Sequence, residues 1–168
     1  MKYFYGGIIG LAIMGTSIAL VAESHPVKKQ PKIEKIEKIE KMFVEYGSPV
    51  PKQMTNAVNA TKRPELMAAI ALQESDGTPW AKGKAGEKGA FQVIEKDWKI
   101  KVSDNPTEQA LQAEKILDEL LEASKGDVKK ALSMYNGGSR PPKKSYKYAD
   151  SVIAKWKKLK GEVSGKNS

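Results

Sequence analysis

Glu74 is the residue whose sequence surroundings most clearly indicate chemistry. Met67, Ile70 and Ala71 precede it by seven, four and three residues, so in a helix they share its face. Glu74 therefore continues an apolar stripe, and it stands at the C-terminal end of the expected helix, where the macrodipole disfavours negative charge. Both effects favour the protonated carboxyl, which is the form that a general acid needs. A glutamate that points to water from the helix end explains the pattern equally well.

The segment after Glu74 is rich in glycine and leads to polar side chains. Residues 77–89 contain four glycines, and such a loop makes tight turns or brings backbone close to a cleft. Gln92 follows the loop, and Tyr135 and Asn136 form a second aromatic and polar cluster. Rings and amides that meet in one cleft suit sugars, which stack and hydrogen-bond. The alternatives are an ordinary surface residue for Gln92, a buried core ring for Tyr135 and a turn for Asn136.

The composition excludes several kinds of catalytic and metal-binding site. Cysteine is absent, and His25 is the single histidine of the chain. A disulfide scaffold, a thiolate metal site and a cysteine nucleophile are therefore excluded. A serine–histidine–aspartate triad or a multi-histidine metal site needs a better-placed imidazole than one near the N-terminus. We therefore expect no metal and no cofactor, and a reaction that uses carboxylates, hydroxyls, amides and lysines.

The elements that would position these residues are helices. The chain has 168 residues, of which 40% are hydrophobic and 29% charged, which predicts about one globular domain with short extensions. Apolar periodicity and capping residues predict six helices, and no alternating strand pattern of useful length is present. The fold class expected is therefore mainly α, with one core. The helices are expected at residues 51–62, 64–74, 91–98, 105–124, 127–135 and 146–160.

The N-terminus carries a targeting signal in this interpretation. Lys2 is followed by an uncharged run over residues 6–22, a length on the border between a signal-peptide core and a membrane-spanning helix. Residues 1–22 are therefore predicted to be a signal peptide or a membrane anchor, and either one exports the rest of the chain. The predicted location is the periplasm or cell envelope, with inner-membrane anchoring through residues 6–22 if the signal is not cleaved.

A charged linker is predicted between this signal and the domain. Residues 23–47 include two prolines and the tripeptide Ile-Glu-Lys repeated three times over residues 33–41. An apolar residue at every third position drifts around a helix and forms no single stripe. The pattern therefore favours a charged spacer over a partner-binding helix. The compact domain is expected over residues 48–161, followed by a flexible tail over residues 162–168.

Four short motifs in this order resemble the soluble lytic transglycosylase (SLT) domain, a lysozyme-like family. Glu74 and Gln92 are separated by 18 residues, as in the family's usual pattern. The sequence departs from that pattern where Ala90-Phe91 replaces Leu-Met and where Gly137 replaces Ala, and neither change removes a polar catalytic group. The motifs are ES at 74–75, GAFQ at 89–92, YNGG at 135–138 and YA at 148–149.

The resemblance implies a fold, an activity and a set of site residues. The fold is a lysozyme-like domain with the Gly-rich loop beside its catalytic cleft. The activity is that of a lytic murein transglycosylase, which cleaves the bond between N-acetylmuramic acid and N-acetylglucosamine in peptidoglycan and closes a 1,6-anhydro ring. Glu74 would act first as the acid and then as the base, and the hydroxyl of Tyr148 would point at it. The substrate-binding residues that it implies are Ser75, Gln92, Tyr135, Asn136 and Tyr148.

Other functions remain open at this point. A single carboxyl suffices when the nucleophile belongs to the substrate, whereas a water-using glycosidase needs a second one. Nearby candidates are expected to be exposed, as acidic residues mostly are, but one facing Glu74 would allow hydrolysis by a phage-type lysozyme with a signal anchor. A non-catalytic peptidoglycan-binding component of a wall-spanning assembly is the third hypothesis, and secretion-system or phage partners are not identified. The candidate carboxylates are Asp76, Glu87, Asp97 and Asp104.

The charge of the chain also limits the classes of partner that are expected. The formal net charge is +9, and residues 140–160 alone hold eight basic residues against Asp150, a balance of +7. Such a stretch is attracted to an anionic wall or membrane surface, although a solvated helix face explains it equally well. No nucleic-acid-binding motif accompanies the charge, so no nucleic acid is expected as a partner.

Overall fold

The computed structural model describes residues 30–162. The predicted signal or anchor at residues 1–22 and nearly all of the predicted tail lie outside the described residues. Within the described range, no helix combines the length and the apolar character needed to cross a bilayer.

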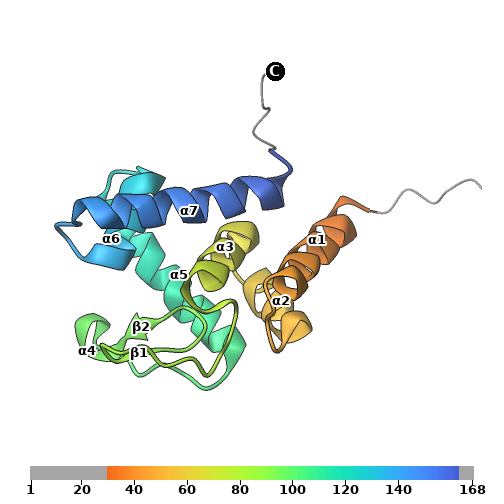
Figure 1. Cartoon of the computed structure of the whole chain (residues 1–168), viewed down its shortest axis with the longest axis horizontal. Coiled ribbons are helices and arrows are strands. Elements are labelled where there is room, and N and C mark those ends of the chain that lie inside the picture. The colour runs from red at the N-terminus through yellow and green to blue at the C-terminus, as the bar shows by residue number, and fades with distance from the viewer. Residues whose placement is uncertain (1–29, 163–168) are drawn as a thin grey trace, which may run out of the picture.

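The described residues form a helical domain with one small hairpin (Figure 1), so the mainly α fold class is confirmed. In chain order, three helices precede the hairpin and four follow it. The elements are α1 (Pro31–Glu45), α2 (Pro51–Asn59), α3 (Pro64–Ser75), β1 (Glu87–Lys88), β2 (Val93–Ile94), α4 (Glu95–Trp98), α5 (Pro106–Ala123), α6 (Val128–Gly137) and α7 (Lys143–Lys160).

The helix starts follow simple capping chemistry. A proline stands in the first turn of α1, α2, α3 and α5, where its missing N–H leaves no intrahelical bond unmade. The side chain of Asn105 accepts hydrogen bonds from the backbone N–H groups of Thr107 and Glu108 at the start of α5. Asp127 accepts one from Lys130 at the start of α6. These caps place the helices where the sequence predicts them, to within a few residues at their ends.

Helix α3 is the centre of the domain. Seven consecutive residues of this helix, 66–72, are buried, so the helix has no solvent-facing stripe until its last turn. Helix α7 packs along both α3 and α6, and α2 lies against α1, α3 and α5. Helix α3, whose last turn carries Glu74, is therefore packed among α1, α2, α5 and α7 (Figure 1).

The helix predicted at residues 91–98 is wrong over its first half. Val93 and Ile94 form β2 instead, which pairs antiparallel with β1 so that Lys88 faces Val93 and Glu87 faces Ile94. β-branched residues fit a pleated pair better than a helix. Gln92, immediately before them, has a φ of 47°, which no α-helix accommodates. The helix is therefore limited to the single turn α4.

Helix α1 occupies most of the segment predicted to be a charged spacer. The three isoleucines of the repeat turn progressively inward: Ile33 is 47% exposed, Ile36 is half-buried and Ile39 is fully buried. The isoleucines therefore shift around the helix as a three-residue period requires. Met42 and Phe43 follow Ile39 and continue the buried face of the helix. The ion pairs Lys35–Glu65 and Lys158–Glu45 join this helix to α3 and α7. Residues 31–45 thus pack with the domain.

Candidate active site

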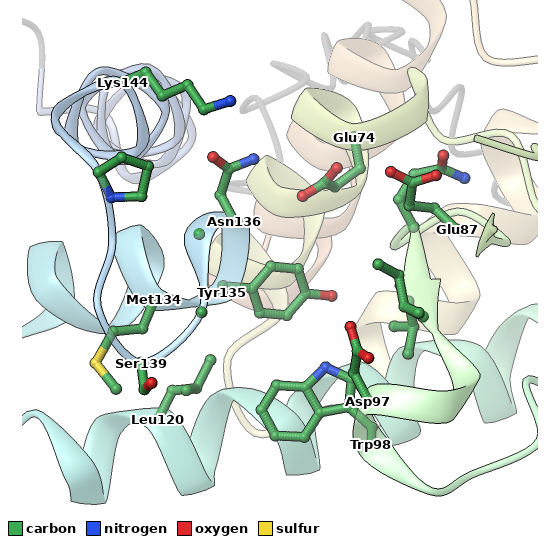
Figure 2. A pocket seen from close by; sticks show the side chains of 16 residues that line it. Glu74, Glu87, Asp97, Trp98, Leu120, Met134, Tyr135, Asn136, Ser139 and Lys144 are labelled. Carbon is green, nitrogen blue, oxygen red and sulfur yellow. The ribbon is translucent and has the colours of Figure 1, made fainter. Parts of the chain in front are cut away.

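A cleft of about 610 Å³ opens beside the C-terminal turn of α3 (Figure 2). The hairpin and α4 form one wall, and the end of α6 with the loop to α7 forms the other. Glu74, Gln92, Tyr135 and Asn136 all line this cleft, although they come from three separate parts of the chain. The fold therefore brings together four of the residues that the sequence nominates.

Glu74 is half-buried and receives a hydrogen bond from another helix. The hydroxyl of Tyr148, on α7, donates to Oε1 of Glu74 at 2.6 Å. The pKa of Glu74 is raised to about 7, because burial and the negative charge of Glu87 raise it by more than the Tyr148 hydrogen bond lowers it. Close to neutral pH, the carboxyl is thus present in both its protonated and its ionised form, as a group that gives and then takes a proton requires.

The two tyrosines near Glu74 remain neutral donors. Burial and the charge of Glu74 raise the pKa of Tyr135 and of Tyr148 well above the usual value for a phenol. Because Tyr148 donates to Oε1, that oxygen is already occupied as an acceptor. A proton on the carboxyl therefore belongs on the other oxygen, Oε2. The arrangement defines which oxygen can deliver a proton to a bound molecule.

Ser75 lies beside Glu74 but does not line the cleft. Its hydroxyl donates to the carbonyl of Ala90 at 2.9 Å and accepts from the backbone N–H of Thr78 at 3.0 Å. These two hydrogen bonds join the end of α3 to the Gly-rich loop, and the role of Ser75 in orienting the substrate or the acid stays a prediction. Asp76, the residue directly after α3, has a φ of 52°, so the chain turns sharply just after Ser75.

Gly77 lets the chain make this turn. Its φ is +73°, and a Cβ there would lie 2.7 Å from the ring of Phe43 in α1. Both the backbone conformation and the space therefore require glycine at this position. The hydroxyl of Ser48 also donates to the carbonyl of Gly77 at 3.0 Å, so the turn after the acid is held from the N-terminal side of the domain.

Gln92 and Tyr135 are tied to the hairpin segment. The Nε2 group of Gln92 donates to the carbonyl of Gly89, and the hydroxyl of Tyr135 donates to the carbonyl of Phe91, both at 2.9 Å. The positive φ of Gln92 turns the chain at the mouth of β2. Tyr135 thus spans from α6 to the opposite wall and fixes the two walls relative to each other, while its ring borders the cleft (Figure 2).

Two of the four candidate second carboxylates belong to the cleft. Glu87 and Asp97 line it together with Glu74. Asp76 is exposed at the end of α3, and Asp104 lies outside the cleft. The described residues hold no cluster of acidic and histidine side chains that could bind a metal ion.

Two further residues line the cleft without a clear signal in the sequence. Trp98 follows Asp97 on one wall, and Lys144 lies on the other beside Asn136 (Figure 2). Trp98 has no distinguishing feature in the sequence beyond its aromatic character, and Lys144 is one of many lysines in the basic C-terminal stretch. The cleft therefore has an acidic wall from the hairpin and α4, and a wall with an amide and an ammonium from α6 and α7.

Comparison with protein families gives one match. The family model of the transglycosylase SLT domain matches residues 54–158. The match includes every element that lines the cleft and leaves α1 outside. Neither the curated proteins nor the solved structures contain a match to the chain.

Proposed function

Because the chain belongs to the transglycosylase SLT domain family, we propose that it is a lytic transglycosylase of peptidoglycan with Glu74 as its single acid and base. Membership indicates a lysozyme-like domain that acts on peptidoglycan, outside the cytoplasm. The bond cleaved in this proposal is the β-1,4 link from N-acetylmuramic acid to N-acetylglucosamine.

The proposed reaction has two proton transfers. Glu74 gives its proton to the glycosidic oxygen as the bond from that oxygen to the anomeric carbon breaks, and N-acetylglucosamine leaves with a new 4-hydroxyl. The C6 hydroxyl oxygen of the muramyl residue then bonds to the anomeric carbon, and its proton passes to the Glu74 carboxylate. A 1,6-anhydro ring forms, no water is consumed, and Glu74 ends protonated as it began.

The observation that carries the proposal is the placement of Glu74, which is half-buried in a cleft of about 610 Å³ and accepts the Tyr148 hydroxyl at 2.6 Å, with its pKa raised to about 7. A carboxyl with this pKa can serve in both steps near neutral pH. Gln92 and Asn136 would hydrogen-bond to sugar or stem-peptide groups, Tyr135 would border the bound glycan, and Tyr148 would hold the acid in place. The nucleophile is part of the substrate, so its attack needs no base other than Glu74.

Product analysis on purified sacculi tests this function. We expect the wild-type chain to release 1,6-anhydromuropeptides, which are lighter by one water than the products of hydrolysis. Glu74→Gln should lower the rate by roughly 10³-fold or more, because the amide has no proton to give at this step. Glu119→Gln makes the same chemical change on the exposed side of α5 and should keep the wild-type rate. Products with an intact reducing end would contradict the transglycosylase assignment.

Hydrolysis is the second candidate function, and the two additional carboxylates of the cleft favour it. Glu87 or Asp97 could activate a water molecule on the face of the sugar opposite Glu74, as the second acid of an inverting glycosidase does. The same mass measurement separates the two reactions by one water. Binding to sacculi without any product would instead support a non-catalytic wall-binding component.

Export through the N-terminus remains part of the proposal. The uncharged run at residues 6–22 would carry the domain to the periplasm or cell envelope and would anchor it in the inner membrane if it is not cleaved. Fractionation of cells that produce the full chain, followed by mass analysis of its N-terminus, tests both parts. Recovery of intact protein in the cytosolic fraction would contradict export.

A further inference from the structure

A second carboxylate shares the cleft with Glu74 and comes from a different element. Glu87 is a residue of β1, is half-buried, and lines the same cleft (Figure 2). The residue directly opposite it in the hairpin is Ile94, which also lines the cleft. Two carboxyl groups in one partly desolvated space interact more strongly than two on an open surface.

The loop provides a specific seat for the Glu87 side chain. Its Oε2 accepts a hydrogen bond from the backbone N–H of Ala85 at 2.8 Å. A Cβ on Gly83 would collide with that same oxygen and would lie 2.9 Å from Oε1 of Gln92. A side chain at Gly83 would therefore push the flexible ends of Glu87 and Gln92 out of these positions.

The charges around this pair come from every wall of the cleft. Asp97 on α4 adds a third carboxylate, Lys144 on α7 adds a cation beside Asn136, and Tyr135 and Tyr148 present phenols. Of the two other carboxylates in the cleft, the one whose charge raises the pKa of Glu74 is Glu87. This influence agrees with the placement of the two groups in Figure 2, where Asp97 lies beside Trp98 and Glu87 lies beside Glu74.

We propose that Glu87 is a second functional carboxylate of this cleft, held by the backbone N–H of Ala85 so that its negative charge faces Glu74 and stabilises the positive charge that develops on the anomeric carbon. The inference rests on the proposed function and deepens it. Glu87 forms no bond in this step and accepts no proton. A preorganised charge aimed at a developing one is a large source of rate enhancement.

The test compares Glu87→Gln with wild type on sacculi, from about pH 5 to about pH 9. We expect kcat/KM to fall by roughly 10- to 100-fold, within the range for loss of one transition-state charge contact. The alkaline limb of the profile, which reports loss of the Glu74 proton, should move to lower pH because the repelling charge is gone. The products should remain 1,6-anhydromuropeptides.

Two variants control this experiment. Asp97→Asn removes another negative charge from the cleft and should leave the midpoint of the alkaline limb at its wild-type value. Gly83→Ala displaces the ends of the Glu87 and Gln92 side chains together, so its rate is compared with that of Gln92→Ala, which leaves Glu87 in place. If Glu87→Gln fails to fold, Glu87→Ala decides the question: a wild-type rate and midpoint in that variant overturn the proposal.

The remaining outcomes separate the inference from the function beneath it. A Glu87→Gln enzyme with the wild-type rate and midpoint overturns the role of Glu87. The proposal is also overturned if wild type gives the hydrolysed product and Glu87→Gln gives the anhydro product. Glu87 would then be the base that activates water. If wild type produces no anhydro product, the proposed function fails. The influence of Glu87 on Glu74 is then still tested by titrating the Glu74 carboxyl by carbon NMR in wild type and in Glu87→Gln. Identical titration curves overturn the inference.

Discussion

At the scale of single residues, one proton on Glu74 is held by opposing influences. Burial raises the pKa of the carboxyl, the hydrogen bond from Tyr148 lowers it, and the charge of Glu87 raises it. The resulting pKa of about 7 is the sum of these three effects. Substitution of either neighbour should therefore move the pH dependence of the reaction, and the two substitutions should move it in opposite directions.

Tyr148→Phe should shift the alkaline limb of kcat/KM to higher pH. The ring remains to bury Glu74, but the hydrogen bond that favours the ionised carboxyl is lost, so its pKa rises above 7. The maximal rate should fall, because the carboxyl is no longer held in one orientation. Tyr146→Phe is the matched control, since this tyrosine is exposed on the same helix. A limb that moves to lower pH would contradict this expectation.

Glu74→Gln should stabilise the fold at alkaline pH. The folded-state pKa of about 7 lies above the ordinary value of 4.5, so the folded protein binds more protons than the unfolded chain between these values. The free energy of unfolding of the wild type therefore falls as pH rises through this window. Glu74→Gln has no carboxyl to ionise at this position, so its free energy of unfolding does not fall for this reason. The gain should approach at most about 3 kcal/mol at high pH and vanish below pH 4.5. Urea unfolding of both proteins across pH measures it, and a pH-independent difference would contradict the burial argument.

At the scale of elements, the turn after Glu74 depends on a helix outside the family match. Phe43 of α1 fills the space above Gly77, and Ser48 holds the carbonyl of the same glycine. Helix α3 therefore ends against a support that comes from the N-terminal side of the domain. A domain cut at residue 54, the first residue of the family match, would lack this support.

Phe43→Ala should destabilise the protein by about 3–5 kcal/mol, as truncation of a fully buried aromatic ring does. Its activity at moderate temperature should fall as well, because the turn after Glu74 loses its packing. Val44→Ala is the control on the next position of α1, where the side chain is 58% exposed, and it should change stability by less than about 0.5 kcal/mol. Thermal unfolding of the three proteins provides the comparison. Equal losses in both variants would show that α1 does not pack as described.

The sequence predicted the large helices and a half-buried position for Glu74, and it failed where long-range contacts decide. Asn105 and Asp127 predict the starts of α5 and α6, because an N-cap depends only on neighbouring residues. By contrast, Val93 and Ile94 form a strand because β1 is available to pair with them, and Ile39 is buried because α1 meets α2, α3 and α7. Glu87 was visible as a candidate, but its place in the cleft depends on the hairpin register, which a two-residue strand does not reveal in advance.

At the scale of the whole molecule, the cleft joins two differently charged parts of the chain. The acidic wall comes from residues 74–97, and the facing wall leads into α7, whose lysines contribute much of the net charge of +9. Most lysines of α7 are exposed, and those at positions 143, 147 and 157 neither line the cleft nor form an ion pair among the described residues. These charges are available to an anionic wall polymer.

Binding to sacculi should therefore weaken as salt rises. Between about 0.1 M and about 1 M salt the screening length falls from about 10 Å to about 3 Å, so contacts from exposed lysines should be largely lost. Replacing Lys143, Lys147 and Lys157 with Gln should weaken binding at low salt and flatten its salt dependence. The matched control replaces three lysines that are exposed on other parts of the chain, at positions 52, 115 and 125. Co-sedimentation measures both, and equal effects of the two triple variants would assign the attraction to net charge alone.

The hydrogen bond between Tyr148 and Glu74 joins residues that are 74 positions apart, and this has a consequence for biosynthesis. A nascent polypeptide that ends at residue 142 already contains the acid and its own helix, yet it lacks the phenol and the last helix that shields the carboxyl from water. Such an intermediate would titrate closer to an ordinary glutamate and would be a poor acid at neutral pH. The raised pKa of Glu74 therefore depends on the last helix of the domain, and a chain that stops before α7 would lose it.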